Sequence, residues 1–226
     1  MHSGAVLEKC LFKMARTPKQ IEMRLPTHGG KRDGAGRKPA GARPGVPHKR
    51  RPTLSRHHPV HVTLRVRQEV WNLRSRRCFR AIARAFARGK QRDGFALVHF
   101  SVQGNHLHLI VEAETAEQLA RGIQGLAIRL ARGLNRVMQR RGDVFADRYH
   151  AHALRTPTEV ANALAYVLGN FVRHAARRGE TISASWVDPY SSAAVSVELT
   201  GPPLVVTPQT WLLSVGWRRA RVSAAA

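Results

Sequence analysis

Two histidines one residue apart are the first feature of this chain that could do chemistry. His106 and His108 lie in the segment GNHLHLIVEA, with the apolar Leu107 between them. If this segment is a β-strand, Leu107 faces a core and both imidazoles point to the opposite side, about 6.5–7 Å apart along the backbone. Imidazoles at that spacing can converge on one metal ion. The same spacing is common on exposed strands, so a third ligand and a reacting group must come from elsewhere.

Candidates for both groups lie on a helix predicted for residues 157–178. Tyr166 and Asn170 are four residues apart and therefore neighbours on one flank, which Arg173 and Arg177 share. This polar ridge borders an apolar stripe, which we expect to be buried. The members of the stripe are Val160, Leu164, Val167 and Phe171. A polar sheet face could meet the ridge at the border of that buried stripe.

The elements that must position these residues can be read from the periodicity of apolar residues. Alternation predicts strands, and a spacing of three to four residues predicts helices capped at Thr115 and Thr156. The predicted order is strand 58–66, helix 69–88, strands 95–103 and 104–113, helix 115–142, strand 144–154 and helix 157–178. Such an order indicates an α+β fold in which helices pack on an antiparallel β-sheet.

One face of the predicted sheet is polar. Because side chains alternate along a strand, polar residues of the first three strands share one side. They are His61, Thr63, His99, Ser101, His106 and His108. In the strand over 95–103, alternation places Val98 with Phe100 and Val102 on the apolar side. His61 and His99 are read either as groups that support the pair or as groups that face a nucleic acid.

Composition indicates the class of partner. The 226 residues carry 38 Lys and Arg against 14 Asp and Glu, a formal net charge of +24. A surface this basic favours a polyanion, most plausibly nucleic acid, and no long apolar span predicts contact with a membrane. The two cysteines lie far apart, which excludes a disulfide framework. We therefore expect a reduced, cytoplasmic protein without a signal peptide.

Three regions follow from these patterns. Residues 1–57 form a flexible basic arm, because the stretch 26–56 is rich in Gly, Pro, Lys and Arg and has no apolar period. Residues 58–179 form the folded domain, and residues 180–226 form a C-terminal tail. Within the arm, we expect contacts to nucleic-acid phosphates. The residues concerned are Lys31, Arg32, Arg37 and Lys38.

Four segments resemble one protein family, the HUH-type single-tyrosine transposases, and within it the branch associated with repetitive extragenic palindromes. They are SVQGNHLHLIVEA, VFADRYHA, ALAYVLGN and, in the arm, GGKRDGAGRKPAG. One departure is that Asn170 precedes Phe171, where many relatives have proline. The resemblance implies a ferredoxin-like or RRM-like HUH fold, with the catalytic tyrosine on a late helix.

The activity that the resemblance implies is cleavage and rejoining of single-stranded or hairpin DNA. Tyr166 would be the nucleophile and would form a 5′-phosphotyrosine. His106, His108 and Asn170 would hold Mg²⁺ or Mn²⁺, since two neutral imidazoles and an amide oxygen suit these ions better than zinc. Arg173 or Arg177 would hold the DNA backbone. Some relatives are homodimers that exchange the tyrosine helix, so a homodimer is a possible state.

Other interpretations stay open at this point. Tyr149 is a weaker candidate for the nucleophile, because it lies on a predicted strand without a partner at helical spacing, and Tyr190 is weaker still, because it lies in the irregular tail. A second His-x-His pair, His150 and His152, is read as surface or DNA-contacting groups. A basic protein that binds DNA or RNA without catalysis would explain the charge equally well. A two-histidine phosphoesterase acting on RNA ends is a third alternative, favoured only by the HVT and HLH segments.

Overall fold

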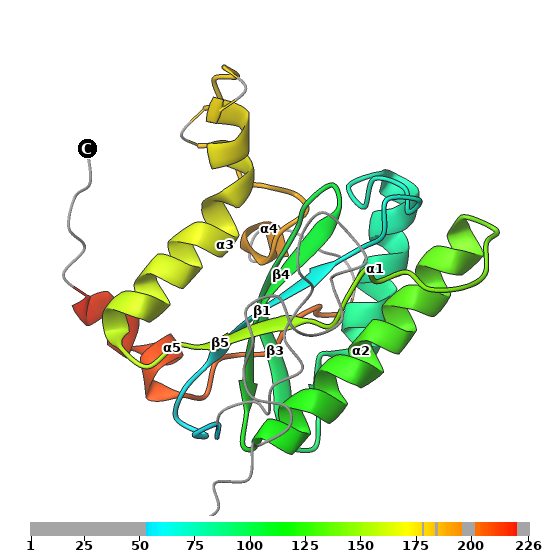
Figure 1. The fold of residues 1–226 in the computed structure, drawn as a ribbon. Helices are drawn as coiled ribbons and strands as arrows, with labels where there is room; N and C mark the ends of the chain where they lie inside the picture. Colours follow the sequence, from blue (N-terminus) through cyan, green and yellow to red (C-terminus); the bar gives the residue numbers. More distant parts are fainter. Residues whose placement is uncertain (1–52, 178, 184, 196–201, 221–226) are drawn as a thin grey trace, which may run out of the picture. The chain divides into compact units, whose positions relative to one another are not determined.

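The computed structural model describes residues 53–177, 179–183, 185–195 and 202–220. They form an α+β fold around a five-stranded antiparallel sheet with the strand order β2-β3-β4-β1-β5. Helices α1 and α2 cover one face of the sheet and α3 covers the other (Figure 1). The predicted fold class is therefore confirmed.

Four strands lie where alternation predicts them, although the last one is shorter, and the short strand β2 was not predicted. The strands are β1 (Val60–Arg65), β2 (Gln91–Arg92), β3 (Phe95–Val102), β4 (His106–Ala113) and β5 (His150–Ala153). Instead of a strand over 144–154, only an isolated bridge pairs Phe145 with Val66 before β5 begins. The Asp147 carboxylate accepts a hydrogen bond from the Arg148 backbone N–H at 2.7 Å. Such a local bond offers the backbone an alternative to pairing with β1, which explains why the residues just before β5 form no strand.

The three long helices are α1 (Arg76–Gly89), α2 (Ala116–Val137) and α3 (Pro157–Arg177). Helix α1 begins later than predicted because Ser75 caps it, accepting from the Cys78 N–H at 3.3 Å. Helix α3 begins with a reciprocal capping box. Thr156 Oγ1 accepts from the Glu159 N–H at 3.2 Å, and the Glu159 carboxylate accepts from the Thr156 N–H at 3.3 Å.

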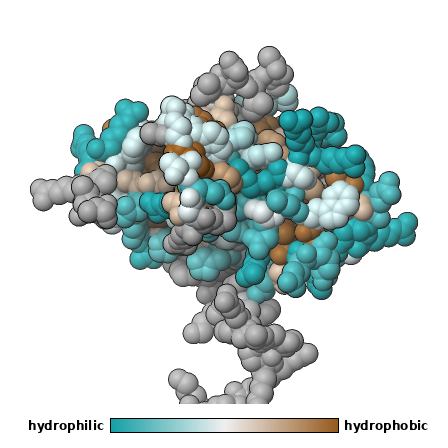
Figure 2. All heavy atoms as spheres, turned by 90° about the horizontal axis from the view of Figure 1, so that it is seen from above, coloured by the Kyte–Doolittle hydropathy of each residue, from teal (hydrophilic) through white to brown (hydrophobic). Residues whose placement is uncertain are grey.

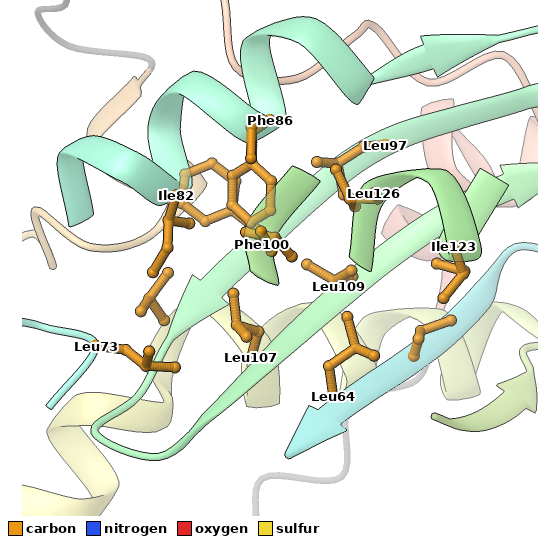
Figure 3. Packing of buried hydrophobic residues seen from close by; sticks show 14 of the residues in the cluster. Leu64, Leu73, Ile82, Phe86, Leu97, Phe100, Leu107, Leu109, Ile123 and Leu126 are labelled. Atoms are coloured by element: carbon orange, nitrogen blue, oxygen red, sulfur yellow. The ribbon is translucent and has the colours of Figure 1, made fainter. Parts of the chain in front are cut away.

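The larger core lies between the sheet and the helices α1 and α2. Leu107 and Leu109 of β4 point into it, and Phe86 of α1 meets Phe100 of β3 with ring centroids 4.7 Å apart (Figure 3). Gly122 lets α2 approach the sheet, since a Cβ there would stand 2.2 Å from the ring of Phe95. Because this core occupies one face of the sheet, His106 and His108 must project from the other face.

A β-bulge in β3 corrects one predicted face. The pairing of β3 with β4 shifts between Leu97 and His99, so Val98 is the extra residue. Leu97 and Phe100 therefore share the larger core, while Val98 turns toward α3. The prediction that grouped Val98 with Phe100 was wrong, because alternation cannot show an inserted residue.

The described parts of the C-terminal segment pack on the domain. They include α4 (Ser192–Val195), α5 (Trp211–Ser214) and the 3₁₀ turn Gly216–Arg219. The buried Glu112 carboxylate accepts hydrogen bonds from the N–H groups of Gln209 and Thr210, and this fixes the start of α5. Figure 2 shows a mainly hydrophilic surface with smaller apolar areas between. Among the helices of the described residues, none is both long and apolar enough to cross a membrane.

Candidate active site on the histidine face of the sheet

Helix α3 lies across the same face of the sheet as the paired histidines. Its residues Val160, Leu164 and Val167 pack with Val98 and Ile110 in a second, smaller core. Ile110 follows His108 by two positions on β4, so both side chains project from the same face. The apolar residues of α3 thus hold its polar residues beside the histidines.

Tyr166 meets the histidine pair directly. Its hydroxyl oxygen lies 3.5 Å from His108 Nε2, and the two ring centroids are 5.0 Å apart. The ring centroids of His106 and His108 are 4.7 Å apart. The phenol remains 36% exposed, so a strand of nucleic acid could reach it.

Neighbouring side chains orient both imidazoles through Nδ1. His108 Nδ1 lies 3.2 Å from His61 Nε2 and 3.2 Å from Thr63 Oγ1, and Thr63 is the residue opposite His108 in the β1–β4 ladder. His106 Nδ1 lies 2.8 Å from Asn105 Oδ1. Because an amide oxygen only accepts, Nδ1 of His106 carries the proton and its Nε2 keeps a lone pair. Contacts of this kind set ring orientation in metal-binding histidines.

Burial keeps these imidazoles neutral. Desolvation, together with neighbouring imidazoles, lowers the pKa of His108 to about 3 and that of His61 to about 4. Burial also lowers the pKa of His106, with His174 and Arg65 adding to the shift. A neutral imidazole is the form that binds metal, so ligation here needs no prior loss of a proton at neutral pH.

Asn170 is buried, which the helical stripe does not predict. It is 1% exposed, and its Nδ2 has no hydrogen-bond partner within the described structure. The prediction that Phe171 belongs to the buried stripe was wrong. Its ring instead lies against the guanidinium of Arg74, 3.9 Å from Cζ to the ring centroid. A buried amide nitrogen without a hydrogen-bond partner is energetically costly, which favours a further group beside Asn170 when the site is occupied.

The model of the IS200-like transposases matches residues 55–170, a range that includes His106, His108, Tyr166 and Asn170. The chain belongs to this transposase family. Its fold is similar to that of a REP-associated tyrosine transposase solved with a bound REP hairpin, at 15% identity and a TM-score of 0.51. The likeness covers 73% of this chain and 93% of that one. No curated protein matches the chain.

The other two tyrosines of the transposase lie away from the histidine pair. Tyr149 packs against the larger core on the opposite side of the sheet. Tyr190 packs against Phe79, with ring centroids 4.9 Å apart, and against the guanidinium of Arg74. Of the three tyrosines in the chain, Tyr166 is the one beside His108.

The remaining predicted residues have different places. His150 and His152 are exposed on β5, opposite Thr63 and His61. His99 Nδ1 lies 3.2 Å from Ser192 Oγ, and His99 is opposite Ile110 in the β3–β4 ladder. The predicted DNA-binding residues lie partly on α3 and partly outside the described residues. Arg173 is exposed on α3, Arg177 ends that helix, and Lys31, Arg32, Arg37 and Lys38 lie outside the described residues.

Sequence reasoning missed His174. It lines a cavity together with His106 and lies four residues after Asn170, so the helical spacing that linked Tyr166 to Asn170 could have found it. Within the part of the chain that the structure describes, no group of three His, Cys, Asp or Glu side chains is placed to hold a metal. The predicted ligand set differs from such a group in having two imidazoles and an amide.

Proposed function

We propose that this transposase cleaves and rejoins single-stranded, hairpin-bearing DNA and that Tyr166 is its nucleophile. The observation that carries the proposal is the phenol oxygen 3.5 Å from Nε2 of the neutral, buried His108. Membership of the IS200-like transposases supports a DNA-processing enzyme. Hairpin DNA as the substrate is supported by the REP hairpin bound to a transposase of similar fold.

The reaction exchanges one phosphodiester bond for another. Tyr166 Oη attacks the scissile phosphorus and forms a bond to it, while the bond from phosphorus to the 3′ oxygen breaks. The products are a 5′-phosphotyrosine and a free 3′-hydroxyl, and the reverse attack rejoins the strand. The phenol proton leaves through water, to which the partly exposed ring has access, and a proton from water completes the 3′-hydroxyl.

The residues beside Tyr166 suit Mg²⁺ or Mn²⁺. His106 and His108 present neutral imidazoles, and Asn170 adds a buried carboxamide whose nitrogen has no partner in the described structure. A carboxamide can turn its oxygen toward a cation, and oxygen is the donor that these two ions prefer. When bound, such an ion would polarise the scissile phosphate.

Basic residues outside the site would bind the DNA backbone. Arg173 is exposed on α3 one turn beyond the site, and Arg177 follows it one turn later. We assign the same role to the N-terminal arm, residues 1–57, because its composition is basic. Residues 58–179 would be the catalytic domain. Sedimentation in the presence of hairpin DNA tests whether the protein forms a homodimer that exchanges α3.

The decisive experiment detects the covalent intermediate. A labelled oligonucleotide with a hairpin and single-stranded flanks is incubated with the full chain and Mn²⁺, and the products are separated on a denaturing gel. We expect a shifted protein–DNA band that Tyr166→Phe abolishes. Tyr149→Phe is the matched control, because that tyrosine packs on the opposite side of the sheet. No band with the unmodified chain, or a band that persists in Tyr166→Phe, overturns the proposal.

A second arm separates catalysis from binding. Replacing His106 and His108 by alanine should abolish the covalent band and leave salt-dependent DNA binding nearly unchanged, because most affinity comes from contacts to phosphate. Binding without cleavage by the unmodified chain would instead favour a non-catalytic DNA-binding protein.

A further inference from the structure

A cavity of about 400 Å³ opens beside His106, next to the candidate active site. The loop before α1, the turn between β3 and β4, and the C-terminal half of α3 form its walls. Hydrogen-bonding side chains dominate the lining, and none of the described residues that line it is acidic. They include three carboxamides and two imidazoles: Asn72, Gln103, Asn105, His106 and His174.

The three carboxamides are held in place by bonds that use only part of their capacity. Asn72 Oδ1 accepts from the Arg74 N–H at 2.9 Å, and Asn105 Oδ1 contacts His106 Nδ1 at 2.8 Å. Gln103 is 4% exposed, and its Nε2 donates to Ser101 Oγ at 2.8 Å. A primary amide has two N–H donors and an oxygen with two lone pairs. Each side chain therefore keeps donors or lone pairs beyond these contacts.

The charge of the cavity argues against a phosphate as its occupant. Arg74 is the cation in the lining, and both of its terminal nitrogens donate to the Asp188 carboxylate at 2.9 Å. That pairing neutralises the guanidinium, so the described lining offers hydrogen-bonding groups rather than an unpaired arginine. A neutral ligand with donors and acceptors along one edge fits such a lining better than an anion. A nucleobase has such an edge, and amides read it in protein–DNA complexes.

We infer that this cavity holds the base of a nucleotide next to the scissile phosphate, and that Asn72, Gln103 and Asn105 select that base. The inference rests on the proposed function, since His106 belongs both to the cavity and to the site that would hold the phosphate. Phe171 completes the wall, and its ring is held there by contacts with the Arg74 guanidinium and the Trp186 ring. The protein itself would thus read sequence at the cleavage position.

Equilibrium binding tests the inference without chemistry. The full chain carrying Tyr166→Phe is titrated with fluorescent hairpin oligonucleotides in which each flanking position carries each of the four bases in turn. We expect one position to show a preference of roughly tenfold to a hundredfold, as for other bidentate amide contacts to bases. Gln103→Met and Asn72→Ala, each added to this background, should reduce the preference at that position alone. Gln124→Ala is the control, an exposed amide on α2.

The outcomes separate this inference from the proposed chemistry. If both cavity variants keep the base preference, or weaken binding equally for all sequences, the cavity does not select a base. If the unmodified chain forms no covalent adduct while the cavity variants still lose the preference, the nucleophile proposal fails and the base site stands. Adduct formation with an unaltered preference in both variants supports the nucleophile and overturns the base site. Circular dichroism of each variant checks folding, and the exposed Asn72 provides a variant that leaves the buried Gln103 in place.

Discussion

The ion pair between Arg74 and Asp188 joins distant parts of the fold, and replacing Asp188 by alanine measures its contribution to stability. The two side chains are only 13% and 2% exposed. Two parallel bonds of 2.9 Å connect them, and Arg74 also donates to the Val102 carbonyl oxygen at 2.9 Å. The rings of Phe171 and Tyr190 contact the same guanidinium. The alanine variant leaves this buried cation without its counter-charge.

Removing one partner of a buried pair costs about 3–5 kcal/mol of unfolding free energy. For a domain of this size that loss lowers Tm by roughly 6–20 °C. Equilibrium unfolding in urea, followed by tryptophan fluorescence, measures it. Glu69→Ala is the comparison, because it breaks the exposed Arg67–Glu69 pair and should leave stability within experimental error. A loss below about 1 kcal/mol for Asp188→Ala would refute the assignment of a buried, structurally important pair.

Three further variants test other parts of the structure. Gly122→Ala should lower the free energy of unfolding by about 1–3 kcal/mol, because the new methyl group meets the Phe95 ring; a gain in urea stability would contradict this contact. Glu112→Gln leaves one acceptor oxygen fewer at the start of α5. Amide hydrogen exchange there, including the Thr210 N–H, should therefore accelerate, while exchange in α1 should not change. Exchange at the start of α5 that is as slow in the variant as in the unmodified chain would argue against the contact. Burial lowers the pKa of His99 below its ordinary value of 6.5. As the pH falls below 6.5, the unfolded chain takes up this proton first, so stability present above that pH is lost toward the folded-state pKa. In a chelating buffer, unfolding free energy should therefore decrease from pH 7 to pH 5, and His99→Gln should make the decrease shallower; an unchanged slope would show that His99 does not contribute.

The sequence predicts β1, β3 and β4 because side chains along a strand have a period of two. Leu107 is fully buried among the apolar residues, so the imidazoles beside it must project from the opposite face, as the structure has them. The cap at Thr156 likewise fixes the start of α3. Local patterns of this kind need no knowledge of distant residues.

Features that depend on distant contacts could not be predicted in this way. Thr63 and His61 contact His108 only because β1 and β4 pair in one particular register. On α3, Asn170 is buried where the sequence predicted Phe171 to be buried. The Phe171 ring instead contacts the guanidinium of Arg74, a residue that lies far away in the sequence. Periodicity describes one element at a time, whereas these contacts join two or three elements.

Arg74 serves two purposes, which has a consequence for how this enzyme can diverge. Its guanidinium secures the C-terminal segment through Asp188 and also forms part of the cavity beside His106. Any descendant that altered this arginine to accept a new target would unfold more readily at the same time. Asn72 is exposed, so a change at this position should cost less stability than a change of Arg74. New DNA preferences should therefore arise first at the loop amides and only rarely at the arginine behind them.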